Sequence, residues 1–303
     1  MVHGKDTEMM VSVIMITYGH EKYIEEAING VFIQQTDFPV ELIIANDCSP
    51  DQTDEVVKLL LRRAPENITV RYTKHQTNKG MNANFLWAAS QATGKYIALC
   101  EGDDYWTDPL KLQKQVDFLE ENEEYVLTFH PVKIKNPDGS LVDDFITEVP
   151  ANYELQETLA SGDNYIHTPS VVFRNIIKVF PPEFSLSPIG DYFLYMILTE
   201  HGKMKMQADY MAVYRYGVGI FSSQSNIKRA KSSVSFHSLL LAWSSNTDLN
   251  KFFIRKNDEA VSYLEEIIRD EYAGKLATDH ILVRALNVLR NPQSIWRKLK
   301  QKL

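Results

Sequence analysis

Two kinds of segment alternate along the first hundred residues, and this alternation limits the possible folds more than any other feature of the chain. Short apolar runs recur between helix-like stretches, at residues 11–18 (VSVIMITY), 40–46 (VELIIAN), 68–72 (ITVRY) and 96–100 (YIALC). Apolar runs of this length are typical of strands that are covered on both faces. The stretches between them are HEKYIEEAINGVFIQQ, DQTDEVVKLLLRRA and NANFLWAASQAT. Alternation of this kind predicts a doubly wound α/β fold with a mostly parallel sheet.

The spacing of apolar residues predicts which face of each helix is buried. Ile24, Ile28 and Val31 fall on one face of the first helix, and Val56, Leu59 and Leu60 share a face of the second. The middle of the chain is less regular: its predicted elements are a hairpin of residues 127–134 and 141–145, strands at 170–174 and 211–216, and a helix at 191–200. From Ser225 onward the pattern is mostly helical.

Charge and composition exclude several classes of protein. The 303 residues carry a formal net charge of −8, which argues against a nucleic-acid partner because such proteins need a basic face. No run approaches the roughly 18 apolar residues of a membrane span, and the first residues show no signal-peptide pattern, so we expect a cytoplasmic protein. Cys48 and Cys100 are predicted to be small buried residues, with a disulfide between them left open.

A group of carboxylates follows the fourth apolar run, in the segment ALCEGDDYWTDPLKL at residues 98–112. Ligands of open parallel sheets bind where strands end, and carboxylates held together repel unless a cation or a proton relieves them. Glu101, Asp103 and Asp104 therefore predict a site for Mg²⁺ or Mn²⁺, ions that prefer oxygen ligands. Asp108 has a simpler interpretation, as the N-cap of a helix with Pro109 in its first turn.

A second polar loop follows the second apolar run. Asp47 lies at the end of that strand and is a candidate for accepting a hydrogen bond from a ligand, although Asx turns after strands are common. Asp51 or Thr53 is predicted to cap the next helix. Lys79-Gly80 and Asn84 lie in a strand-to-helix loop that could face a nucleotide, and turn chemistry explains them equally well.

In order along the chain, several segments resemble the family 2 glycosyltransferases of the GT-A fold. They are VSVIMITYGHEKYIEEAI, ELIIANDCSPDQT, NKGMNANFLWAASQATGKYIALCEGDDYWTDP, GDYFLYMILTEHG and MAVYRY, within residues 10–222. The resemblance implies a Rossmann-like, mostly parallel sheet flanked by helices. It implies a transferase domain at 1–224, with a nucleotide-binding half at about 10–108 and an acceptor half at about 109–224. A helical extension is expected at 225–303.

The resemblance also implies roles for individual residues. Thr17, Tyr18 and Asp47 would hold the nucleotide, usually uridine, and the predicted nucleotide-binding set is completed by Glu21, Gly80 and Asp103. Glu101, Asp103 and Asp104 occupy the DxD-type metal motif, with Glu in the place of the usual first Asp.

The general base that deprotonates the acceptor would be Asp191, and capping of the following helix is the alternative. The family often has a His after the Tyr-Arg strand, and residues 214–222 (YRYGVGIFS) lack it, so water or phosphate is expected as a further metal ligand. The remaining histidines are interpreted as ordinary core or surface residues.

The activity implied is inverting transfer of a sugar from a nucleotide diphosphate sugar, usually a UDP-sugar, to a saccharide or lipid-linked saccharide in bacterial surface polysaccharide synthesis. Two alternatives remain open: a non-catalytic module that binds nucleotide sugars, and a sugar nucleotidyltransferase. Residues 283–303, which include Trp296, carry six basic side chains and no acidic one. They predict either peripheral contact with an anionic membrane or a solvated terminus.

Overall fold

The computed structural model describes residues 9–219 and 223–272, and its N-terminal part alternates strands and helices as the sequence predicts. The elements are β1 (Val11–Thr17), α1 (Ile24–Phe32), β2 (Val40–Asn46), α2 (Thr53–Leu60), the 3₁₀ helix η1 (Leu61–Arg63), β3 (Ile68–Lys74), α3 (Met81–Gln91) and β4 (Tyr96–Leu99). Strands β4, β1, β2 and β3 are parallel neighbours in that order. The predicted parallel α/β arrangement is therefore confirmed for this part of the chain.

The rest of the described chain adds strands to this sheet and builds a second one. Its elements are β5 (Tyr105–Trp106), α4 (Lys111–Glu121), β6 (Tyr125–Phe129), β7 (Val132–Lys135), β8 (Leu141–Asp143), α5 (Gln156–Ser161), η2 (Thr168–Ser170), β9 (Val172–Arg174), α6 (Pro182–Leu186), α7 (Gly190–Leu198), β10 (Lys203–Met206), β11 (Ala212–Arg215), α8 (Asn226–Trp243) and α9 (Thr247–Tyr272). The large sheet has the order β10-β6-β9-β4-β1-β2-β3, and the small sheet has the order β5-β11-β7-β8. Within the large sheet, β9 is antiparallel to both β4 and β6.

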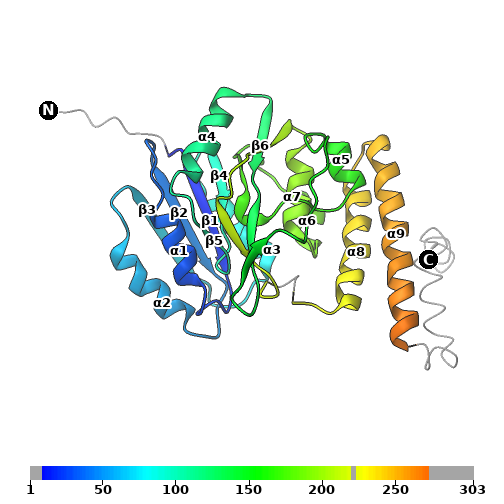
Figure 1. Ribbon diagram of the computed structural model, residues 1–303, viewed down its shortest axis with the longest axis horizontal. Helices are drawn as coiled ribbons and strands as arrows, with labels where there is room; N and C mark the ends of the chain where they lie inside the picture. The colour runs from blue at the N-terminus through cyan, green and yellow to red at the C-terminus, as the bar shows by residue number, and fades with distance from the viewer. Residues whose placement is uncertain (1–8, 220–222, 273–303) are drawn as a thin grey trace, which may run out of the picture.

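The central strands β1, β2 and β4 are buried on both faces, which explains why they are apolar runs rather than alternating ones. Along β1, Val11, Val13 and Met15 pack with α1, α2 and α4 on one face. Ile14 faces the other way, into the core that contains α7. This alternation follows from the two-residue period of a strand. Figure 1 shows α1 and α2 on the side of the sheet away from α7, while α8 and α9 stand at the far end of the molecule.

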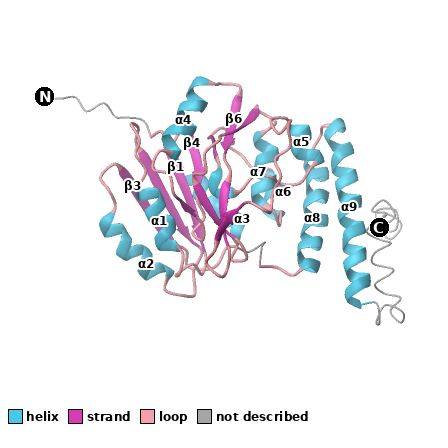
Figure 2. Cartoon of the chain, viewed as in Figure 1, coloured by secondary structure: helices cyan, strands magenta, loops and turns pink. Residues whose placement is uncertain are grey.

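The predicted hairpin of residues 127–134 and 141–145 is wrong in its first half. The segment divides at His130 and Pro131, because β6 joins the large sheet while β7 joins the small one. Strands β7 and β8 do pair antiparallel across the predicted turn, where the Gly139 N–H donates to the Asn136 carbonyl at 2.9 Å. Residues 127–134 thus pass from one sheet to the other, and Figure 2 draws the strands of both sheets in magenta. Side chains of both sheets pack in one core.

Three local predictions need correction. On α2, Val57 and Leu60 are buried whereas Leu59 is 53% exposed, so the buried face is turned by about one residue from the predicted one. Helix α4 begins at Lys111, two residues later than a cap at Asp108 requires; the Asp108 carboxylate instead accepts from the Leu110 N–H at 2.8 Å. Cys48 is only half-buried, Cys100 is fully buried, and both thiols are free.

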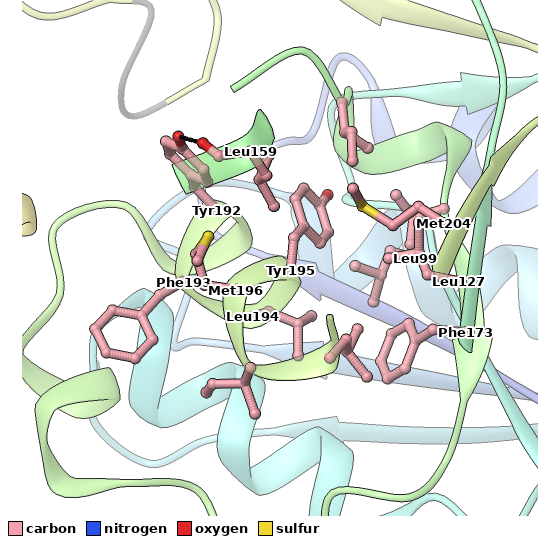
Figure 3. Close-up of a cluster of buried hydrophobic side chains, with 14 of the residues drawn as sticks. Leu99, Leu127, Leu159, Phe173, Tyr192, Phe193, Leu194, Tyr195, Met196 and Met204 are labelled. Atoms are coloured by element: carbon pink, nitrogen blue, oxygen red, sulfur yellow. Dashed lines mark hydrogen bonds between the residues drawn. The ribbon is translucent and has the colours of Figure 1, made fainter. Parts of the chain in front are cut away.

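Helix α7 is the centre of the core on the second face of the large sheet. Figure 3 shows its side chains packed against Leu99, Leu127 and Phe173 of the sheet, while the Tyr192 hydroxyl donates to the Leu159 carbonyl at 2.5 Å. Phe236 and Leu240 of α8 are buried in the same core. The acceptor half and the first C-terminal helix therefore share one hydrophobic core, and the proposed division at residue 224 stays a prediction.

No helix in the described ranges combines the length and the apolarity needed to cross a membrane. The basic stretch 283–303 lies outside the described residues, so its proposed membrane contact stays a prediction.

Candidate active site

One cavity of about 570 Å³ lies at the carboxyl ends of β1, β2 and β4. Its wall includes predicted site residues from five separate segments: Thr17 and Tyr18, Asp47, Gly80, Glu101 and Asp103, and Asp191. This is the edge at which open α/β sheets bind their ligands. Residues separated by more than 170 positions in the sequence are thereby brought to a single cavity.

The three carboxylates predicted to hold a metal lie together at the end of β4. Oxygen atoms of Glu101, Asp103 and Asp104 lie within 4.8 Å of one another. Gly102 between them has no room for a side chain, since a Cβ there would lie 2.6 Å from the Thr17 Oγ1 and 2.9 Å from the His20 Nδ1. The tight packing of this turn against the end of β1 brings the carboxylates on either side of Gly102 close together.

Burial and mutual repulsion make this cluster hold protons when no cation is present. Burial, with Asp103 and Asp191 nearby, raises the pKa of Glu101 to about 8. Burial and the negative charge of Asp103 likewise raise the pKa of Asp104. A divalent cation would relieve both effects, and three convergent carboxylates provide the oxygen ligands that Mg²⁺ and Mn²⁺ prefer. Beside them, the buried Thr17 Oγ1 has no hydrogen-bond partner among the described residues. The residues therefore fit a hard divalent ion.

Asp104 differs from the other two carboxylates in its surroundings. It is 1% exposed and its Oδ1 accepts from the Arg215 N–H at 2.8 Å, whereas Glu101 and Asp103 line the cavity. The Arg215 guanidinium donates to the Asp103 carbonyl and to the Glu26 carboxylate, and lies over the rings of Tyr23 and Tyr105. These contacts of Arg215 therefore help to fix the positions of Asp103 and Asp104. The sequence signal for it was the basic residue of MAVYRY, which is the last residue of β11.

Most of the predicted nucleotide-binding residues line the cavity, whereas Glu21 is outside its lining. Asp47 is 3% exposed, and its carboxylate accepts from the backbone N–H groups of Lys79 (2.7 Å) and Gly80 (2.9 Å). It therefore links the end of β2 to the N-terminus of α3. Glu21 is not among the residues that line the cavity; its carboxylate accepts from the Gln52 N–H at 2.9 Å and joins the loops after β1 and β2.

Asp191 lies in the first turn of α7, and its carboxylate is held on the acceptor side of the cavity. The Asn164 Nδ2 and the Thr168 hydroxyl donate to its Oδ2 at 3.2 and 3.4 Å. Burial raises the pKa of Asp191, which makes its ionised form a stronger base than an exposed aspartate. The capping alternative does not describe this helix, because the N-cap residue is Ile189 and makes no side-chain cap bond.

Three of the histidines that were interpreted as ordinary core or surface residues line the cavity: His20, His167 and His237. His20 Nε2 lies 3.9 Å from an Asp103 carboxylate oxygen, and His167 Nε2 lies 2.9 Å from the Asp144 Oδ2. The contact with His167 helps to lower the pKa of Asp144. For His20 a signal was present, since it lies in the loop that follows β1. His167 and His237 reach the cavity only through long-range packing.

Comparison with known proteins identifies the family to which the chain belongs. The family model described as glycosyl transferase family 2 matches residues 12–180, which is more than half of the chain. The chain belongs to glycosyltransferase family 2.

Among curated proteins, this glycosyltransferase is similar to an uncharacterized protein of Mycobacterium tuberculosis. The two are 40% identical over 214 residues, which cover 70% of this chain and 61% of the relative. The match thus spans about three fifths of that relative's length.

Two solved structures share its fold. The Staphylococcus aureus TarS 1–349 structure in complex with UDP-GlcNAc has a TM-score of 0.58 at 19% identity, with 88% of this chain and 73% of that chain covered. The mannosyltransferase PcManGT from Pyrobaculum calidifontis, in complex with GDP-Man and Mn²⁺, has a TM-score of 0.61 at 15% identity, with 97% and 83% covered. The predicted GT-A fold is therefore confirmed.

Proposed function

We propose that this glycosyltransferase moves a sugar from a nucleotide diphosphate sugar, a UDP-sugar, to the hydroxyl group of a saccharide or lipid-linked saccharide, with inversion at the anomeric carbon. The observation that carries the proposal is the single cavity that Glu101, Asp103 and Asp191 share with Asp47 and Gly80. A metal cluster, a candidate base and a candidate nucleotide loop are the parts that such a transfer needs. A bacterial surface polysaccharide is the destination that the family resemblance implies.

A Mn²⁺ or Mg²⁺ ion held by Glu101 and Asp103, with Asp104 behind them, would supply positive charge for the diphosphate leaving group. The Asp47 carboxylate holds the Lys79-Gly80 loop in place at the nucleotide end of the cavity. Asp191 accepts the proton of the acceptor hydroxyl as its oxygen bonds to the anomeric carbon and the bond from that carbon to the diphosphate oxygen breaks. One base and one displacement give inversion without a covalent enzyme intermediate.

Binding and hydrolysis of the donor test this proposal. Because a ligand that binds the native state raises the melting temperature, UDP-, GDP- and TDP-sugars with Mn²⁺ can be ranked by thermal shift. We expect the largest shift from a UDP-sugar, its loss with EDTA, and slow Mn²⁺-dependent release of UDP. A UDP-sugar that binds with Mn²⁺ and is never cleaved or transferred would favour the alternative of a non-catalytic binding module.

A further inference from the structure

Part of the cavity wall comes from α8, in the C-terminal region beyond the segment matched by the family model. Ser233, Phe236 and His237 line the same cavity as Asp191. Tyr192, the residue after Asp191, stacks on Phe236 with ring centroids 4.8 Å apart. Helix α8 therefore packs directly on the turn that carries the candidate base, next to α7 in Figure 1. A molecule that donates its proton to Asp191 lies beside this face of α8.

His237 has the hydrogen-bonding character of a group that binds a hydroxyl. Its Nδ1 lies 2.8 Å from the Ser233 carbonyl, which can only accept, so Nδ1 carries the hydrogen. The other ring nitrogen, Nε2, is then an acceptor. Burial lowers the pKa of His237, so the ring is neutral at physiological pH. Nε2 has no hydrogen-bond partner within residues 9–219 and 223–272, and His237 lines the cavity, so the residue suits a sugar hydroxyl better than an anion.

The charges on the cavity wall also favour an uncharged ligand at α8. Its wall contains the carboxylates of Asp47, Glu101, Asp103, Asp163 and Asp191, and no Lys or Arg among the described residues. A divalent ion bound by the metal cluster would be paired with the diphosphate of the donor. No further cation is then present on the described cavity wall to bind a second anion beside α8.

A cation whose charge acts on His237 belongs to α9 and is already paired. Lys256 Nζ lies 2.9 Å from an Asp163 oxygen and 3.3 Å from a Glu259 oxygen. An uncharged sugar, in contrast, has apolar ring faces that fit the aromatic ring of Phe236 and hydroxyls that fit His237, Ser233 and Asn164.

We propose that the face of α8 formed by Ser233, Phe236 and His237 is the acceptor subsite, and that it binds an uncharged saccharide rather than a uronic acid or a phosphorylated one. The inference rests on the proposed transferase activity. It adds the chemical class of the acceptor and a role for the C-terminal helical region.

The test measures transfer by the full chain from a UDP-sugar with Mn²⁺ to matched p-nitrophenyl glycosides. Neutral hexosides are compared with the corresponding glucuronide and hexoside 6-phosphate, and hydrolysis of the donor is measured in parallel. We expect kcat/KM for a neutral glycoside to exceed that for its anionic counterpart by at least about tenfold. His237→Ala should lower the ratio of transfer to hydrolysis by about tenfold, the loss expected for one hydrogen bond, and His237→Gln should restore part of it.

A charge variant gives a second test with a matched control. Ser233→Lys places a cation in the subsite and should shift the preference toward the anionic glycosides by about tenfold. Ser235→Lys places the same charge on an exposed position of the same helix, outside the cavity wall, and should leave the preference unchanged.

The outcomes separate the inference from the proposed function. Donor hydrolysis together with a preference for anionic glycosides, or with no transfer to any neutral one, would overturn the acceptor inference and leave the transferase proposal standing. Equal preferences for neutral and anionic glycosides in Ser233→Lys and Ser235→Lys would likewise overturn the acceptor inference alone. Absence of donor binding and of hydrolysis in the native chain would overturn both.

Discussion

Replacement of Asp191 by Asn is the sharpest test of the candidate mechanism. Asn has nearly the same shape, and its Oδ1 can still accept from Asn164 and Thr168, which lie 3.2 and 3.4 Å from the native carboxylate. What it loses is the ability to take a proton. Loss of a general base costs at least about a hundredfold in rate, which corresponds to about 2.7 kcal/mol in the barrier.

The same variant should remain folded, and the structure gives two reasons. Asp191 is not the N-cap residue of α7, and the Asn side-chain oxygen can still accept from the backbone N–H groups that the carboxylate contacts in the first turn. Burial raises the pKa of Asp191 in the folded protein, so the folded state binds a proton there more readily than the unfolded chain does. The stability that this group contributes is therefore complete below the unfolded value near 3.9 and is lost as the pH rises through the folded value. At neutral pH the uncharged Asn avoids the cost of the buried charge, and the melting temperature should equal or exceed that of the native protein.

The assay compares transfer, Mn²⁺-dependent UDP binding and melting temperature in the native protein and in Asp191→Asn. Asp117→Asn serves as the control, because Asp117 is an exposed carboxylate on α4 that accepts a hydrogen bond from the Gln113 side chain at 2.8 Å. We expect UDP binding to survive in Asp191→Asn while transfer falls by about a hundredfold. A folded variant with normal turnover would refute the assignment of Asp191 as the base.

Three further predictions concern the carboxylate cluster and its support. Calorimetry should show UDP binding that depends on Mn²⁺ in the native protein and much less in Asp103→Asn, because diphosphate and carboxylates share the ion; equal affinity in EDTA would contradict the metal site. Without metal, the melting temperature should fall as the pH rises from about 6 to 9, since the pKa of Glu101 is raised to about 8 and its stabilising proton is lost over that range; Glu101→Gln should flatten the slope, and an unchanged slope would count against the buried cluster. Arg215→Met leaves the Asp103 carbonyl without its donor, so thermal unfolding should show a loss of about 1–3 kcal/mol, together with weaker Mn²⁺-dependent UDP binding, and native behaviour would show that Arg215 is not needed to support the cluster.

Much of the N-terminal half was predictable because its information is local. A strand that is covered on both faces must be apolar along its whole length, so β1, β2 and β4 are visible in the sequence as short apolar runs. Parallel strands end at the same edge of the sheet, so the polar residues that follow them were expected to meet there. Asp47, Glu101 and Asp103 do line one cavity. Chain connectivity and side-chain periodicity suffice for this part of the prediction.

The remaining features depend on contacts between residues far apart in the chain, and no local pattern reports them. The Arg215 N–H reaches Asp104 across 111 positions, which decides that this carboxylate is turned away from the cavity. The division of residues 127–134 between two sheets depends on where β9 and β11 pair with β6 and β7. His237 belongs to the cavity wall only because Phe236 stacks on Tyr192. The sequence by itself determined the parallel strands β1, β2, β3 and β4 and the carboxylates that follow them, because periodicity acts within a few residues. The tertiary structure alone decided which side chains face the cavity, because packing joins segments that the sequence separates.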